Sequence, residues 1–238
     1  MRKRLFLWVL LILLMLGCSP EFVQADNPDI ANGIFLNDKN ITLYYYGNNL
    51  SEKNVISWGN ENSFYIDNIE ERYTDLKVES SDPKILEITN KELKGRSFRA
   101  IVKGTGKVKI KVYGTYSGKR KTVSTQVNII KYKNPAKFLK LGKQDFSTKF
   151  KNTAGVYKTK MKEGSYRLGV KSVSGIRIKE MLLTIENGKR GMTTAVSKII
   201  KNSSNICIEK GQKSSLLITF YNSKTKTNQI LVVEILGK

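Results

Sequence analysis

Apolar and polar residues alternate one by one through most of this chain, which is the pattern of a β-strand with one buried face. The clearest case is a predicted hairpin, with strands around residues 107–112 and 122–129 and a turn at residues 116–119. We expect its buried side chains to be Val108, Ile110, Val112, Val123, Val127 and Ile129.

The second half of the chain repeats the alternation. Its apolar runs lie at residues 166–170, 176–185, 216–220 and 231–235, and turns rich in Gly, Asn, Ser and Lys separate them. One stretch, Thr193 to Lys201, instead suggests a short helix. The polar segment KYKNPA at residues 131–136 divides the two halves. The pattern predicts an all-β chain with two β-sandwich domains in tandem, residues 26–133 and 134–238.

The N-terminus has the form of a secretory signal, with basic residues at 2–4 and an unbroken apolar run at 5–16. As a helix the run covers about 20 Å, short of the roughly 30 Å of a hydrocarbon core. Two alternatives follow: cleavage after Ala25, which makes residues 1–25 a signal peptide, or lipidation at Cys18, where Met15-Leu16-Gly17-Cys18 resembles a lipobox. Either predicts an extracellular protein, secreted or attached to the cell surface, and only the second gives it a membrane contact, through a lipid at Cys18.

Cysteine and histidine usage narrows the chemistry. Once Cys18 is removed or lipidated, Cys207 is the one remaining thiol and no intrachain disulfide can form. Because Cys207 lies between Ile206 and Ile208, we expect it to be buried. The chain has no histidine, so it lacks the commonest general base and a usual zinc ligand. We predict no enzymatic activity, no catalytic residues, no cofactor and no metal site.

A group of carboxylates is the one candidate for calcium. It comprises Asp67, Glu70, Glu71 and Asp75. Its spacing is not that of an EF-hand loop, and Arg72 interrupts it.

Charge points to a partner. The chain carries 42 Lys and Arg against 20 Asp and Glu, and residues 131–238 hold 23 basic and 6 acidic residues. Lys107, Lys109 and Lys111 fall on the polar face of the predicted hairpin, about 6.6 to 6.8 Å apart. They are either a strip that binds an anionic cell-wall polymer, a glycosaminoglycan or extracellular DNA, or a solubilising face, or the guard of an edge strand. Sequence-specific nucleic-acid binding is not expected, because the chain has no recognition helix.

Tyr44-Tyr45-Tyr46 is a candidate for glycan binding. In a strand, Tyr44 and Tyr46 share one face, so they can form a carbohydrate platform. The alternative is an ordinary strand with Leu43 and Tyr45 buried and the other two rings half exposed.

The segment LKVESSDPKILEI at residues 76–88, followed by Ala100, Gly106 and the alternating strand of the hairpin, resembles the bacterial immunoglobulin-like domain, group 2. The resemblance covers about residues 34–130. Val78 and Leu86 depart from the family pattern, and residues 48–73 look like an enlarged loop or an inserted strand pair.

The resemblance implies an immunoglobulin-like β-sandwich for the first domain, and alternation alone assigns the second. Together with the N-terminal signal, this predicts two immunoglobulin-like β-sandwich domains in tandem after a cleaved signal peptide. The resemblance also implies a surface module that serves as spacer or binder and has no catalytic residues. We therefore expect an exported, non-catalytic bacterial surface or secreted protein for adhesion, scaffolding or retention through anionic cell-envelope polymers. The alternative is an accessory carbohydrate-binding module. The ligand and the oligomeric state are left open.

Overall fold

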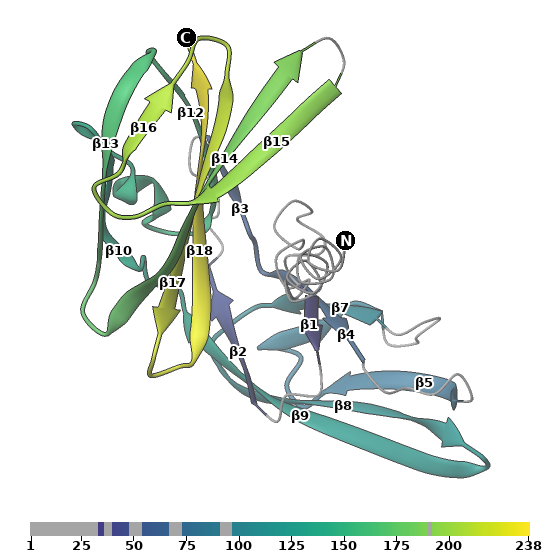
Figure 1. Cartoon of the computed structure of the whole chain (residues 1–238). Coiled ribbons are helices and arrows are strands. Elements are labelled where there is room, and N and C mark those ends of the chain that lie inside the picture. The colour runs from purple at the N-terminus through teal and green to yellow at the C-terminus, as the bar shows by residue number, and fades with distance from the viewer. Residues whose placement is uncertain (1–32, 36–39, 48–53, 67–72, 91–96, 190–191) are drawn as a thin grey trace, which may run out of the picture.

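The computed structural model describes residues 33–35, 40–47, 54–66, 73–90, 97–189 and 192–238, and it confirms an all-β fold (Figure 1). The only helix among these residues is a short 3-10 turn, η2 (Ser147–Phe150). The strands form two β-sandwiches with separate hydrophobic cores. Within this part of the chain, no helix is long and apolar enough to cross a membrane.

The N-terminal sandwich has two four-stranded sheets. One has the order β1-β4-β7-β6 and contains β1 (Gly33–Phe35), β4 (Glu61–Tyr65), β7 (Ser97–Val102) and β6 (Leu86–Ile88). The other has the order β2-β9-β8-β5 and contains β2 (Asn40–Tyr45), β9 (Lys119–Lys131), β8 (Gly106–Tyr116) and β5 (Tyr73–Ser80). In chain order these strands reproduce the ABED and GFC sheets of an immunoglobulin fold, with β2 added in parallel beside β9.

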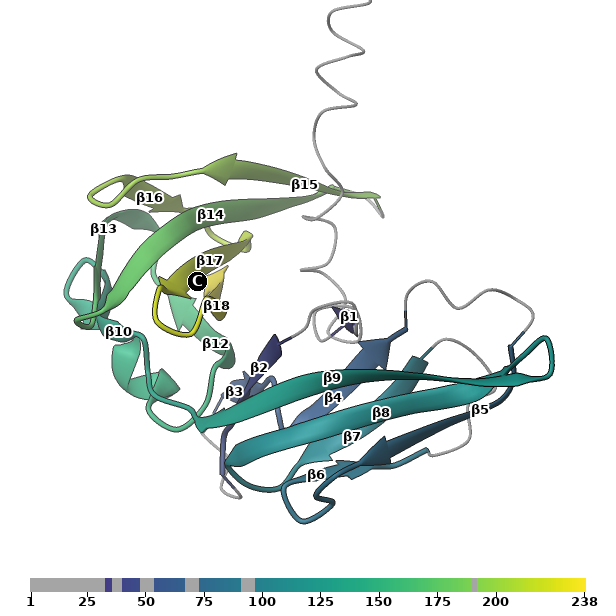
Figure 2. The ribbon, with the colours of Figure 1, turned by 90° about the horizontal axis from the view of Figure 1, so that it is seen from below.

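The predicted hairpin is β8 and β9, and five of its six expected core residues are buried: Val108, Ile110, Val112, Val127 and Ile129. The expectation for Val123 was wrong, because its side chain is 56% exposed. Strand β2 flanks β9 only from Gln126 onward. Figure 2 shows the hairpin running past the strands of the facing sheet, so alternation continues where there is no core to cover.

Within the segment LKVESSDPKILEI, residues Ser80-Ser81-Asp82-Pro83 form a corner that turns the chain out of β5. Ser81 exchanges hydrogen bonds with Lys109: its N–H donates to the carbonyl oxygen and its Oγ accepts from the amide, both at 2.9 Å. The carboxylate of Asp82 accepts from the amide of Lys84 at 3.0 Å. These bonds tie the corner to β8 and direct the chain toward β6.

The C-terminal sandwich has a four-stranded and a six-stranded sheet. The smaller has the order β11-β10-β13-β16 and contains β11 (Gln144–Asp145), β10 (Ala136–Leu141), β13 (Gly164–Ser172) and β16 (Asn205–Ile208). The larger has the order β15-β14-β17-β18-β12-β3 and contains β15 (Met192–Ile199), β14 (Ile176–Lys189), β17 (Lys213–Asn222), β18 (Thr227–Gly237), β12 (Gly155–Met161) and β3 (Val55–Ser57).

Two expectations for this half were wrong. The helix expected at residues 193–201 is strand β15, because its backbone pairs with β14 in an unbroken antiparallel register. Cys207 is exposed, because it lies on β16 between Ile206 and Ile208, which are both buried. Successive side chains of a strand point to opposite faces, so burial of Ile206 and Ile208 turns the Cys207 side chain toward solvent.

Strand β3 joins the two halves. It belongs to the N-terminal half by sequence, yet it pairs antiparallel with β12, placing Ile56 opposite Val156. The insertion suspected at residues 48–73 thus contains two strands, and β3 and β4 pair with different sandwiches. The predicted division at residue 133 stays a prediction, and a cut there removes one strand from the C-terminal sheet.

Some expectations fall outside the described residues. They are the signal peptide at residues 1–25, the lipidation site Cys18, and three of the four carboxylates considered for calcium: Asp67, Glu70 and Glu71. The fourth, Asp75, is exposed on β5.

Candidate functional site

The three lysines of the predicted strip project from β8 on the outer face of its sheet. Lys107, Lys109 and Lys111 are all exposed, and they alternate with buried residues of the core. On the neighbouring strand β9 the residues opposite them are neutral and polar: Asn128, Gln126 and Ser124, respectively. Strand β5 pairs with β8 from Ile110 to Tyr116, and Ser81 bonds the backbone of Lys109. Lys109 and Lys111 therefore do not guard a sheet edge, whereas Lys107 lies beyond the last paired residue of β5 and for it that alternative stays a prediction.

Two more cations share this surface. Lys77 on β5 and Arg120 on β9 stand at register positions on the same face as the three lysines. Lys77 lies opposite Tyr113 and Arg120 opposite Thr115, so the five positions extend along one face of the sheet over about 27 Å, at about 3.4 Å per residue. We call Lys77, Lys107, Lys109, Lys111 and Arg120 the lysine face.

Glu79 is an acid within the lysine face. Glu79 on β5 lies opposite Lys111, but its carboxylate accepts a hydrogen bond from the Tyr113 hydroxyl at 2.6 Å. That bond raises the pKa of the Tyr113 phenol, and the Arg120 guanidinium, 4.4 Å from the ring centre, opposes the rise. Within the described residues, none of the four lysines of this face forms an ion pair.

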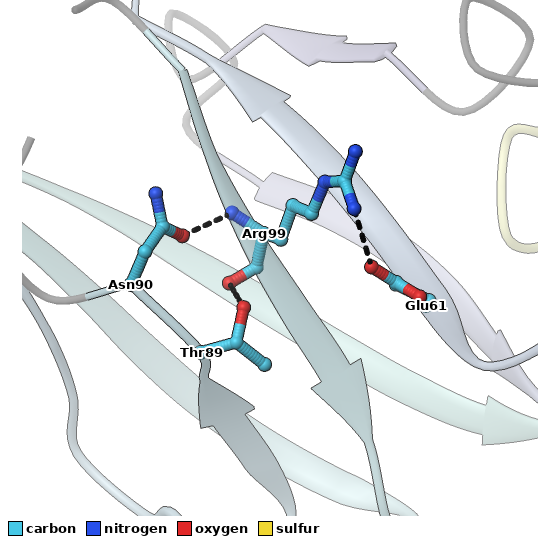
Figure 3. Close-up of polar contacts among 4 residues, drawn as sticks. All are labelled: Glu61, Thr89, Asn90 and Arg99. Atoms are coloured by element: carbon cyan, nitrogen blue, oxygen red, sulfur yellow. Dashed lines mark hydrogen bonds and ion pairs between the residues drawn. The ribbon is translucent and has the colours of Figure 1, made fainter. Parts of the chain in front are cut away.

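The opposite outer surface of the same sandwich is different. There Arg99 on β7 forms an ion pair with Glu61 at 3.4 Å, and Lys103 pairs with Glu87 at 2.6 Å. Figure 3 shows how Asn90 and Thr89 also hold the backbone of Arg99, through bonds of 2.7 and 3.1 Å. Basic residues are thus neutralised on one face of the sandwich, while the lysine face keeps its charge.

Tyr44 and Tyr46 contact the C-terminal half. The Tyr44 hydroxyl lies 2.6 Å from Oγ1 of Thr227, and the Tyr46 ring packs against Tyr132 with 5.0 Å between centres. Burial raises the pKa of both Tyr46 and Tyr132 well above the usual range. The carbohydrate platform stays a prediction, and these contacts favour a structural role for both rings.

Trp58 extends this junction at the end of β3. Its amide donates to the carbonyl of Ala154 at 3.1 Å, and its indole N–H donates to the carbonyl of Ile230 at 3.0 Å. Ser57 also hydrogen-bonds Thr153 through their hydroxyls. Together with the two tyrosines, Trp58 fixes the N-terminal half against the C-terminal core.

The outer face of the six-stranded sheet holds a hollow of about 1000 Å³ that sequence analysis missed. Strand registers align an apolar row across it, which consists of Ile199, Leu182, Leu217, Val232, Val156 and Ile56. A polar row runs beside it, which consists of Ser197, Thr184, Ser215, Glu234, Lys158 and Asn54. Each strand contributes one residue to each row, so only the register reveals the rows.

Among the described residues, no group of three or more His, Cys, Asp or Glu side chains is placed to hold a metal ion.

No protein-family model matches the chain, and no curated protein matches its sequence. Among solved structures, it is similar to the fibronectin(III)-like modules of Clostridium thermocellum CbhA, at 12% identity over 84% of this chain and 89% of that one, with a TM-score of 0.34. A chimeric titin Z1Z2 is similar at 10% identity over 76% and 89%, with a TM-score of 0.29. Domains 7, 8 and 9 of the S-layer protein SbsC are similar at 13% identity over 68% and 46%, with a TM-score of 0.25. The strand order of the N-terminal sandwich is what makes its architecture immunoglobulin-like. The narrower resemblance to group 2 stays a prediction.

Proposed function

We propose that this is an exported, non-catalytic bacterial protein that binds anionic cell-envelope polymers through the lysine face, for adhesion, scaffolding or retention at the surface. One observation carries the proposal. Five cations are gathered on one sheet face, and the lysines among them lack ion pairs within the described residues, whereas Arg99 and Lys103 on the opposite face are paired.

The chemistry of the lysine face suits a repeating anion better than a shaped ligand. Lysine ammonium groups act as point charges without the fixed bidentate geometry of arginine, so they accept phosphate or sulfate in many orientations. The amides and hydroxyls of the adjacent β9 row add neutral hydrogen-bonding groups. The net charge of +22 attracts polyanions from a distance.

The test is a salt series on the whole mature chain, since β3 links both halves. Lys107, Lys109 and Lys111 are changed together to Gln. A control changes three exposed lysines of the C-terminal half, Lys137, Lys162 and Lys171, so that both variants lose the same charge. Binding to teichoic acid and to heparin is then measured against salt concentration.

We expect the strip variant to bind more weakly and to lose roughly two or three contacts from the log-log salt slope, which is about −0.9 per contact on duplex DNA and shallower on other polyanions. The control should keep most of the slope. Equal losses in the two variants would show that the attraction is diffuse and that the lysine face is no site.

The hollow on the six-stranded sheet supports a second candidate, an accessory carbohydrate-binding module. It combines an apolar floor with a row of hydroxyl, amide and charged groups, which suits a neutral glycan. Thr184→Arg would fill the hollow. A glycan array that finds a neutral ligand whose binding is lost in this variant, but kept in the strip variant, would favour this function instead.

A further inference from the structure

The edge strands of the sheets differ in how well they are protected against pairing with another chain. An open edge presents unpaired backbone groups, and proteins usually shorten, bend or charge such strands. Five edge strands here have four residues or fewer: β1, β3, β6, β11 and β16. The edge strand β2 has six residues and no charge, but Tyr44 in it and Tyr46 just after it contact the C-terminal half. The edge strand β5 has eight residues, but a register shift at Asp75 and the charges of Lys77 and Glu79 interrupt it.

Strand β15 has none of these protections within the described part of the chain. It has eight residues, a continuous register against β14 and a single charge, at Lys198. Figure 1 shows it at the border of the six-stranded sheet. In a chain of which 26% is charged, this is an unusually neutral edge.

Both faces of β15 also expose apolar side chains. Val196 is 57% exposed and Ile199 is 73% exposed. They lie on opposite faces, because Ile199 pairs with Leu182 of the outer apolar row, while Val196 pairs with Ile185, which packs on the core side. A strand added beside β15 would cover both side chains and pair the open backbone.

We propose that β15 pairs antiparallel with β15 of a second copy of this chain, so that the two six-stranded sheets become one continuous sheet across a twofold axis. An axis at Val196 places Lys198 opposite the partner's Thr194, and an axis at Ser197 places it opposite the partner's Val196. Neither arrangement opposes like charges. A twofold axis pairs the β15 edge of each copy with that of the other, so no β15 edge is left open and assembly stops at the dimer.

The second copy fits better than an acidic peptide. The edge offers one cation, so an acidic strand would gain at most one ion pair while leaving its other charges beside Val196 and Ile199. A copy of β15 instead supplies apolar and hydroxyl residues on both faces.

Salt separates this association from polymer binding. Two mature chains, each with 39 basic and 19 acidic residues and a net charge of +20, repel each other. Salt screens that repulsion, so the dimer strengthens as salt rises. Polyanion binding weakens under the same change. The dimer does not depend on the proposed function, and one can fail while the other holds.

The first experiment is sedimentation velocity of the mature chain with Cys207→Ser, which prevents disulfide dimers through the exposed thiol. We expect a concentration-dependent dimer that increases between about 0.05 M and about 0.5 M NaCl. Val196→Lys should abolish it. Val123→Lys, at an equally exposed valine of β9, should leave it intact. A monomer under all conditions, or equal losses in the two variants, would overturn the proposal.

The second experiment keeps the test decisive if Val196→Lys folds poorly. Single cysteines are placed at positions 195, 196 and 197 in the Cys207→Ser background and oxidised gently. A twofold axis brings one position next to its own copy, at the Cβ separation of directly opposed residues. We expect one of these variants to form a disulfide-linked dimer. If none crosslinks above a Val123→Cys control, β15 does not pair with itself.

Discussion

Gly155 occupies the point where β3 approaches β12 most closely. Its φ is +156°, and a Cβ atom there would collide with the carbonyl oxygen of Ile56. Glycine is required because the backbone of one half passes directly over the backbone of the other. The junction between the halves thus depends on a missing side chain.

Changing Gly155 to Ala should lower the free energy of unfolding by about 3 kcal/mol, because the collision is with backbone and cannot be relieved by a rotamer. Gly175→Ala is the matched control, since Gly175 also has a positive φ but has no atom within 4 Å of the added Cβ. It should cost only about 1 to 2 kcal/mol. Urea denaturation of both variants makes the comparison, and equal losses would show that β3 docking contributes little.

Tyr46 and Tyr132 make the junction sensitive to alkali. Burial raises the pKa of both phenols, so the folded protein favours their neutral form. Their contribution to stability is therefore complete below about pH 10, the usual pKa of tyrosine, and is lost as pH rises above it. We expect Tyr46→Phe to match the wild type near pH 7 and to lose stability less steeply above pH 10, by up to about 1.4 kcal/mol per pH unit. If the stability of Tyr46→Phe and of the wild type falls equally with pH in denaturation experiments across this range, the raised pKa of Tyr46 is contradicted.

At the scale of elements, the hairpin of β8 and β9 shows both the reach and the limit of alternation. Five of its apolar positions were predicted correctly because a period of two assigns each side chain to a face. Val123 was not, because the same period does not say where the facing sheet ends. Lys107, Lys109 and Lys111 were assigned to one face for the same reason as the core, because they are the other half of one alternating pattern. Lys77 and Arg120 were not predicted, because only the strand registers bring them to that face.

The two ends of the hairpin should respond differently to truncation. Val127→Ala should cost about 2 kcal/mol, since it leaves a cavity in the N-terminal core. Val123→Ala should change stability by less than about 0.5 kcal/mol, because the side chain is already in solvent. Chemical denaturation of the two variants makes the test. Similar losses of stability would show that Val123 packs against something other than the described residues.

Other elements required information that lies outside their own residues. Strand β15 has a composition that permits a helix, and only pairing with β14 decides its structure. The sequence indicated an enlarged loop or an inserted strand pair at residues 48–73, but not that β4 would belong to the N-terminal sheet while β3 pairs with β12 of the C-terminal one. The rows of the hollow depend on five strand registers at once, none of which a single sequence specifies.

At the scale of the whole molecule, the junction should make the two sandwiches unfold together. Trp58, Tyr44 and β3 each bond across it, so melting one half exposes the edge of the other. Scanning calorimetry of the mature chain should show one transition. Trp58→Ala removes the indole bond and its packing and should split the transition in two, with a loss of about 2 kcal/mol from the less stable half. Two transitions already present in the wild type would refute this coupling.

If the chain is exported as proposed, the pairing of β3 with β12 also dictates an order of folding events. A chain that emerges N-terminus first presents β3 about a hundred residues before its partner β12, and β2 waits similarly for β9. Contacts between segments so distant in sequence form slowly, because the entropy cost of loop closure comes before the stabilising contacts are made. Under the proposed export, the leading half therefore stays incomplete until the trailing half has crossed the membrane, and the protein completes its fold only after release.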